Sequence, residues 1–227
     1  MKKTVLFWCL SLFAILSLFS NTGTRDVDVA TNSENQLDPI PVNLDVIQPE
    51  PERQEILVAY YGQPNSRFMG IVGRHSLPEL VELVKATAQN YQELLPEYSV
   101  VPAIYLIFGT VQPEGRIGFM SDALVNRYIE YAKEHNVHII LDHQIGRYSL
   151  QQTMDRLLPY LIHPNVHLAV DFEWRTERPM QEIGFVRGEE LTWMQQYMSD
   201  FLTSNNLPNT KFLIFHQFKS YMVRDHS

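Results

Sequence analysis

The chain has 227 residues, of which 45% are hydrophobic and 19% are charged, a balance that is ordinary for a chain able to bury a core. Its formal net charge of −8 argues against a nucleic-acid partner, because phosphate backbones are bound by clustered lysine and arginine. The single cysteine, Cys9, lies near the N-terminus, so the sequence predicts no disulfide, no cysteine-ligated metal and no thiol nucleophile in the folded part.

Residues 1–24 have the pattern of an export signal. Lys2 and Lys3 precede an uncharged and mostly apolar stretch over residues 4–20, and basic residues before an apolar segment are typical of a secretory signal. No clear small-residue cleavage site follows, so a retained membrane anchor is the alternative. We therefore expect an exported protein, extracellular or anchored and facing outward, that touches a membrane only through this segment.

A polar linker is expected over residues 25–54. This segment is rich in Asp, Asn, Glu, Gln and Pro and shows no sustained period of 2 or 3.6. Such a segment cannot bury enough apolar area to offset the entropy lost on ordering. The folded domain is therefore expected over residues 55–227.

Five short apolar runs in this domain alternate with four helical patterns. Strands are expected over residues 56–61, 101–108, 138–142, 167–173 and 211–218. Helices are expected to begin after Ser76, Ser121 and Ser149 and near Glu189, and Pro159 is expected to end or kink the third one. Alternation of this kind predicts parallel strands joined by right-handed crossovers.

Two architectures fit this alternation, an open doubly wound sheet and a (β/α)₈ barrel. The first strand is followed by Gly62-Gln63-Pro64-Asn65 and not by a G-x-G-x-x-G loop, so a dinucleotide cofactor is not expected. Polar residues at the ends of several strands favour the barrel. We expect an α/β fold of the TIM-barrel type, truncated after about five strands; completion by another chain and an open sheet are the alternatives.

Carboxylates at the end of the fourth strand form the main candidate site, because ligands of parallel α/β folds bind at the carboxyl ends of strands. Asp171 and Glu173 point to the same side of their strand, and Asp142 ends the neighbouring strand. Close carboxylates raise the pKa of at least one member, which leaves a proton donor near neutral pH. Glycoside hydrolysis uses such a pair, so we predict Glu173 as the general acid, tuned by Asp171 and Asp142.

Aromatic and polar side chains at the same strand ends are candidates for substrate binding. Aromatic rings would offer flat faces to sugars, and the polar groups would bind hydroxyls. The candidates are Tyr60, Tyr61, Gln144, Trp174, His216 and Gln217. The alternative is structural, with the carboxylates paired to Arg147, Arg175 or Arg178 in a solvated network.

Histidines at the strand ends raise the question of a metal. His143 and His216, with the two aspartates, would supply nitrogen and oxygen ligands. No ligand-spacing motif supports this hypothesis, so no metal is expected. His138 and His167 lie low on their strands and are predicted to be core histidines whose hydrogen bonds are satisfied by the backbone.

Four strings carry a family resemblance. They are Tyr60-Tyr61-Gly62-x-Pro64, Leu141-Asp142-x-Gln144-x-Gly146, His167-Leu168-Ala169-x-Asp171-x-Glu173 and His216-Gln217-Phe218. Together they resemble a family of exported, largely uncharacterised bacterial proteins with a glycosidase-like (β/α)₈ barrel. The resemblance covers residues 55–218 and implies that fold and export.

The D-x-E triplet is also distantly similar to the chitinase-like and lysozyme-like barrel hydrolases, where the glutamate is the general acid and the aspartate supports it. Carried over, this implies Glu173 as the acid and Asp171 as its electrostatic partner. Those enzymes continue through later strands that help to form the cleft. We expect a glycoside-hydrolase-like protein acting on a cell-envelope or extracellular glycan such as peptidoglycan. The alternatives are a non-catalytic protein that binds a glycan or a partner, and a truncated, inactive barrel.

Overall fold

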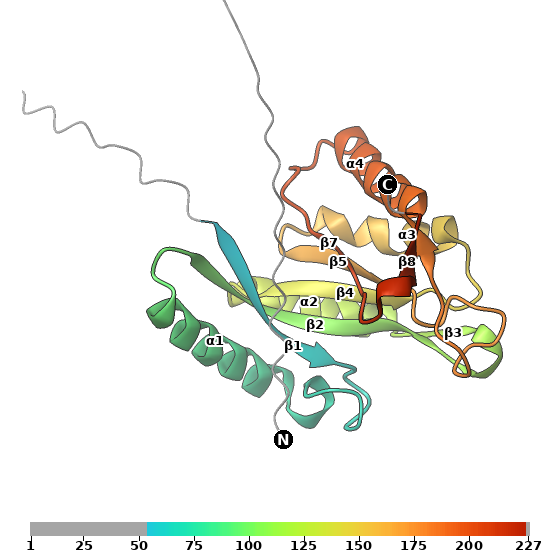
Figure 1. Cartoon of the computed structure of the whole chain (residues 1–227). Helices are drawn as coiled ribbons and strands as arrows, with labels where there is room; N and C mark the ends of the chain where they lie inside the picture. Colours follow the sequence, from blue (N-terminus) through green and yellow to red (C-terminus); the bar gives the residue numbers. More distant parts are fainter. Residues whose placement is uncertain (1–53, 226–227) are drawn as a thin grey trace, which may run out of the picture. The chain divides into compact units, whose positions relative to one another are not determined.

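The computed structural model describes residues 54–225, which form a mixed α/β unit around a curled sheet (Figure 1). The expected signal or anchor, residues 1–24, and residues 25–53 of the expected linker lie outside the described part. Within residues 54–225, no helix is long and apolar enough to cross a membrane.

Five parallel strands form a half-barrel, in the order β1-β2-β4-β5-β7. Their bounds are β1 Glu55–Gly62, β2 Ser99–Val111, β4 His138–Gln144, β5 Val166–Asp171 and β7 Leu213–Phe215. A short strand, β3 Ile117–Phe119, pairs antiparallel with β2, and β6 Val186–Arg187 pairs with β8 Val223–Arg224 in a separate small sheet. The predicted alternation into five parallel strands is confirmed. A closed barrel is not observed, since β1 and β7 are the two edges of this sheet in the described part.

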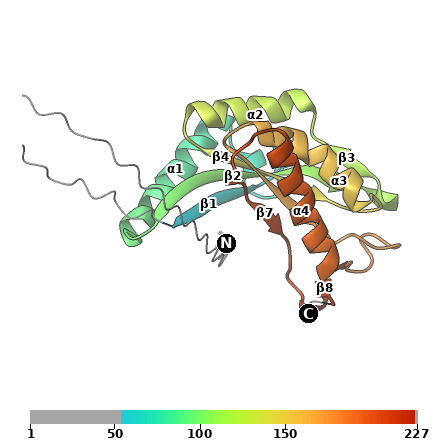
Figure 2. The same ribbon diagram turned by 90° about the horizontal axis from the view of Figure 1, so that it is seen from above.

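Four α-helices pack against one face of the curled sheet, and Figure 2 shows α1, α2 and α3 along that side. Their bounds are α1 Leu77–Leu94, α2 Asp122–Glu134, α3 Leu150–Leu157 and α4 Gly188–Ser204. Short 3₁₀ turns cover Val72–Arg74, Pro113–Gly115, Leu158–Ile162 and Ser220–Met222. The helices begin where the serine caps predict: Ser149 accepts a hydrogen bond from the Gln152 N–H at 3.1 Å, and the Gln152 side chain accepts from the Ser149 N–H at 2.9 Å. As predicted from Pro159, α3 ends at Leu157 and continues only as a 3₁₀ turn.

The pleat of the strands gives the sheet two different faces, because successive side chains point to opposite sides. Outward side chains such as Leu106, Leu141 and Phe172 join the main core beneath the helices. Inward side chains form a smaller apolar cluster of Ala103, Tyr105, Ile140 and Ala169, with Leu57, Ala59 and Ile214 partly buried against it. This alternation decides which residues at the strand ends reach the inner face.

Two histidines form a pair at the amino ends of β4 and β5. The Phe212 N–H donates to His167 Nδ1 at 3.1 Å, so the neutral His167 ring carries its hydrogen on Nε2 and donates it to His138 Nδ1 at 2.8 Å. The prediction of a core histidine satisfied by the backbone is confirmed for His167. His138 is satisfied by its partner ring. Beside them the Lys211 ammonium donates to three carbonyls, at 2.6, 2.9 and 3.1 Å.

The His138–His167 pair predicts a stability that declines in acid. Burial, and then the neighbouring His138 and Lys211, lower the pKa of His167 to about 3, whereas an unfolded histidine titrates near ~6.5. The stabilisation is therefore present above pH ~6.5 and is lost as the pH falls from there towards about 3. Over this range the free energy of unfolding should fall by up to ~1.4 kcal/mol per pH unit, because the unfolded chain binds one more proton. Urea unfolding of His167→Asn between neutral pH and pH ~4.5 should show a shallower decline than the wild type.

The matched control is His75→Asn, which should keep the wild-type slope because His75 lies just before α1 and outside the pair. An equal slope in His167→Asn and the wild type would contradict this account of the pair.

Candidate functional site

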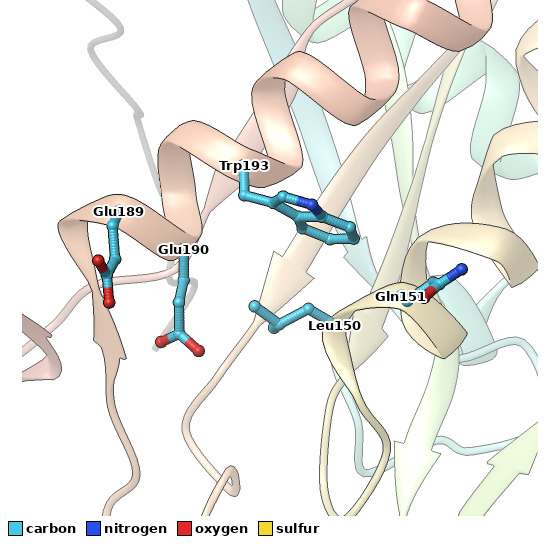
Figure 3. Close-up of a pocket in the computed structure, with 5 residues that line it drawn as sticks. All are labelled: Leu150, Gln151, Glu189, Glu190 and Trp193. Atoms are coloured by element: carbon cyan, nitrogen blue, oxygen red, sulfur yellow. The ribbon is translucent and has the colours of Figure 1, made fainter.

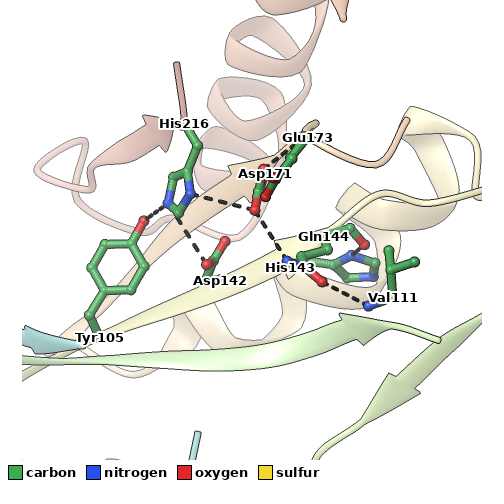
Figure 4. A network of polar contacts seen from close by, with 8 residues as sticks. All are labelled: Tyr105, Val111, Asp142, His143, Gln144, Asp171, Glu173 and His216. Carbon is green, nitrogen blue, oxygen red and sulfur yellow. Dashed lines mark hydrogen bonds and ion pairs between the residues drawn. The ribbon is translucent and has the colours of Figure 1, made fainter. Parts of the chain in front are cut away.

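Inward-facing side chains from all five parallel strands converge at the carboxyl ends of the half-barrel. We call them the strand-end cluster; its members are Tyr61, Tyr105, Asp142, Asp171, Glu173 and His216. Tyr61 lies opposite Tyr105 in the register of β1 and β2, and their rings meet edge to face at 5.2 Å between centroids. His216 follows β7. Its backbone N–H donates to the Val170 carbonyl at 3.2 Å, and this bond places the imidazole side chain beside Asp171 (Figure 4).

The three carboxylates of the cluster lie at successive depths. Asp142 pairs in register with Ala169, and Asp171 pairs with Gln144, so Asp142 lies one inward layer deeper than Asp171. Glu173 follows two residues beyond the end of β5. Asp142 is 0% exposed and Asp171 3% exposed, whereas Glu173 is half-buried.

Asp171 is held in place by both of its oxygens. Oδ1 accepts the Glu173 N–H at 2.8 Å, and Oδ2 accepts from Gln144 Nε2 at 3.3 Å. Gln144 is itself fixed, because its Oε1 accepts the Val111 N–H at 2.8 Å (Figure 4). Burial opposes ionisation, but these hydrogen bonds and the His216 charge outweigh it and lower the pKa of Asp171. Asp171 is therefore a fixed negative charge.

His216 lies between the two aspartates. Its Nδ1 is 3.7 Å from Asp171 Oδ2, its Nε2 is 3.8 Å from Asp142 Oδ2, and Nε2 also makes a hydrogen bond with the Tyr105 hydroxyl. Burial alone would lower the pKa of His216, but the charges of Asp142 and Asp171 raise it to about 9. At neutral pH the ring is an imidazolium, and both nitrogens carry a hydrogen.

Asp142 differs from Asp171 because neither of its oxygens makes a hydrogen bond of ordinary geometry among the described residues, although the Tyr61 hydroxyl lies close enough to influence it. Burial raises the pKa of Asp142 to about 7, although the His216 charge and the nearby Tyr61 hydroxyl act in the opposite direction. The pKa of the Tyr61 hydroxyl is raised by burial and by Asp142, so Tyr61 stays protonated at neutral pH. Its ring is 37% exposed.

The surroundings of Glu173 favour its protonated form. Partial burial and the Asp171 charge raise the pKa of Glu173, while the His216 charge lowers it by less. None of the three arginines of the structural alternative has an ion pair with these carboxylates among the described residues, and the Arg147 side chain donates only to the Glu177 carbonyl, at 3.4 Å. Arg175 binds both oxygens of Glu190 at 2.6 and 2.7 Å, and Arg178 binds Glu182 at 2.6 Å.

Two predicted residues, Tyr60 and Gln217, lie apart from the strand-end cluster. Tyr60 points to the helix side, where its hydroxyl bonds with Thr87 of α1 at 2.7 Å. The reason is the strand period: Tyr60 and Tyr61 are adjacent, so both cannot face inward. Gln217 is exposed and donates weakly to the carbonyls of Lys219 and Ser220. Trp174 follows Glu173 and is partly exposed.

His143 also faces the helices. Its ring packs edge-on against Phe108, Phe119 and Tyr148, and its Nδ1 donates to the Gln144 carbonyl at 2.7 Å. His143 therefore does not lie with His216, Asp142 and Asp171 on the inner face, as the metal hypothesis would need. Within residues 54–225, no group of three or more His, Asp or Glu side chains is arranged to hold a metal ion.

Tyr105 is the cluster member that sequence reasoning missed. It lies within the long strand β2 and not at its end, so a search of strand ends passes over it. The signal that could have found Tyr105 is its inward position, which follows from the pleat once the register with Tyr61 is known.

Gln144 has a different part from the predicted one of binding substrate. Its side-chain amide is bound to Val111 and Asp171, so it positions Asp171.

Two pockets lie on the helix side, away from the strand-end cluster. The first, of about 410 Å³, is lined by Leu150, Gln151, Glu189, Glu190 and Trp193 at the junction of α3 and α4 (Figure 3). The second, of about 330 Å³, includes Asp155, Pro159 and Tyr197. Trp193 stacks on Tyr197 between them, at 4.8 Å. Of the two glutamates that line the first pocket, Glu190 is already bound to Arg175.

Asp171 should control the protonation of His216. Asp142, Asp171 and Glu173 together raise the pKa of His216 from its ordinary value to about 9, so loss of the Asp171 charge in Asp171→Asn should make the histidine titrate at lower pH. Histidine-labelled NMR titration measures the midpoint directly. Asp155→Asn on α3 serves as the control and should leave the midpoint unchanged. A wild-type midpoint near the ordinary ~6.5 would refute the ion-pair arrangement.

Comparison with known proteins gives no family for this chain. No protein-family model matches the sequence, and no curated protein matches it. The geometry and charge of the strand-end cluster are therefore the guide to function, and the family resemblance of the sequence stays a prediction.

Proposed function

We propose that this domain is the glycoside-hydrolase-like part of an exported protein that acts on a cell-envelope or extracellular glycan, with Glu173 as its general acid. Asp171 and Asp142 tune that acid. One observation supports this above all: Glu173 has a raised pKa and lies next to Asp171, a carboxylate whose pKa is lowered. Two carboxyl groups with opposite shifts fit the protonated acid and charged partner that glycosidic cleavage uses.

The proposed chemistry divides between the two carboxyl groups. Glu173 donates its proton to the glycosidic oxygen as the bond from that oxygen to the sugar carbon breaks. Positive charge then develops on the sugar carbon, and Asp171 is the fixed negative charge that stabilises it. Water adds to that carbon and returns a proton to the Glu173 carboxylate, which completes the hydrolysis. Tyr61 and Trp174 would bind the sugar rings, since both rings are partly exposed.

The half-barrel supports a relation to TIM-type barrels because its polar residues gather at the carboxyl ends of its parallel strands. We propose that it corresponds to the first five strands of such a barrel, as the resemblance to the glycosidase-like family implies. Export is proposed from the basic and apolar pattern of residues 1–24.

The second candidate is a non-catalytic protein that binds a glycan or a partner at the same cluster. The positions of Asp171 and Gln144 favour the binding protein. Their polar atoms are hydrogen-bonded within the protein, so these side chains form a rigid, preorganised lining. Binding of a glycan needs such a preorganised lining, whereas only hydrolysis needs a proton donor as well. Turnover therefore separates the two candidates.

Glu173→Gln should abolish hydrolysis while leaving glycan binding in place, because the amide cannot donate the required proton. Release of reducing ends from peptidoglycan and chitin-type glycans measures turnover, and a loss of about 10²-fold or more is expected for a general acid. The control is Glu177→Gln, an exposed side chain in the loop that follows Glu173, which should retain activity. Glycan binding without turnover in the wild type would favour the binding protein.

The pH profile tests the pairing of the two carboxyl groups. Activity should fall as pH rises through the raised pKa of Glu173, because the acid loses its proton. In Asp171→Asn the neighbouring negative charge is removed, so the alkaline limb should move to lower pH. An unmoved or oppositely moved limb would show that Glu173 is not the titrating acid.

A further inference from the structure

Asp142 is a fully buried carboxylate of the strand-end cluster that has an ion pair with His216 but no hydrogen bond of ordinary geometry among the described residues. It is 0% exposed. A buried polar group left without a partner costs roughly 1–3 kcal/mol, and more when it is charged. Such groups in native proteins are commonly explained by a ligand, ion or water that completes them.

The charges around Asp142 decide what kind of ligand completes it. Glu173 is protonated as the proposed acid, and the Asp171 carboxylate already balances the imidazolium of His216, so the cluster gains a net negative charge when Asp142 ionises. The nearby Arg175 is already bound to Glu190 and so does not compensate the excess. A ligand that carries negative charge would be repelled, and a neutral hydroxyl would supply a hydrogen but no charge.

We propose that the strand-end cluster takes a glycan with free amino sugars, and that a protonated amine of the ligand binds at the Asp142 carboxylate. This inference rests on the proposed glycan-directed function and names its substrate class. The ammonium supplies both the missing hydrogen-bond donors and the missing positive charge. To reach Asp142 it displaces Tyr61, whose hydroxyl approaches that carboxylate and whose ring is 37% exposed.

Binding should also release a proton, which gives the inference a readout separate from turnover. At mildly acidic pH the Asp142 carboxyl is largely protonated, because burial raises its pKa to about 7. An arriving ammonium favours the ionised carboxylate, so the carboxyl proton passes to the buffer. No proton should be released on binding when Asp142 is replaced by Asn.

The test is calorimetric titration of the full chain at mildly acidic pH with three oligosaccharides of equal length. They are a glucosamine oligomer, its fully N-acetylated counterpart and a galacturonate oligomer. The glucosamine oligomer should bind at least about tenfold more tightly than the acetylated one, the size of one charge-assisted contact. Repeating the titration in buffers of different ionisation enthalpy measures the released proton.

Asp142→Asn should remove both the preference and the proton release, and Glu82→Gln, on the exposed side of α1, should remove neither. Equal binding of the free and acetylated oligomers, or tighter binding of galacturonate, would overturn the amine inference and leave the proposed function standing. Binding of none of the three by folded protein would count against both. Asp142-dependent binding of spermidine without any glycan binding would overturn the glycan assignment.

Discussion

The strand-end cluster depends on one electrostatic constraint, the placing of two buried aspartates on either side of a single imidazole. Burial works against the charge of each group taken alone. His216 becomes a cation because Asp142 and Asp171 lie within 3.8 and 3.7 Å of its two nitrogens. That cation in turn helps Asp171 to remain ionised. The pKa of the outer Glu173 then reflects its neighbours, since the negative Asp171 raises it and His216 lowers it by less.

The backbone creates this arrangement through two local features. The parallel register sets Asp142 and Asp171 at successive inward layers of neighbouring strands. Asp171 then ends its own strand, because its Oδ1 accepts the N–H of Glu173, a side-chain turn that competes with further ladder pairing. Glu173 is thereby lifted out of the sheet towards solvent. The same D-x-E triplet thus contributes one buried charge and one accessible acid.

Much of the fold could be predicted from the sequence because the responsible forces are local. Apolar runs mark the five parallel strands, and the serine caps mark where the first three helices begin. Strand ends were less certain, and β5 stops at Asp171, two residues early, because a side chain takes the place of a ladder partner. The short strands β3, β6 and β8 were missed because two or three residues carry no periodic signal.

The site was only partly predictable because it depends on which face of a strand each residue occupies. The D-x-E spacing predicts a common side for Asp171 and Glu173, but β5 ends at Asp171, so Glu173 reaches the cluster from the turn beyond the strand. The end of the fifth parallel strand places His216 nearby. Tyr60 was grouped with Tyr61 although the pleat separates them, and its hydroxyl meets Thr87 instead. Tyr105 enters the cluster from within β2, and only the register reveals it.

The central claim is that the two carboxyl groups of the D-x-E triplet have been driven in opposite directions by their surroundings. A carbon-detected NMR titration of Asp- and Glu-labelled protein measures both side-chain pKa values in one experiment. The account predicts that Asp171 titrates below, and Glu173 above, its ordinary range. Ordinary values for both groups, or a Glu173 that titrates below its usual range, would contradict it.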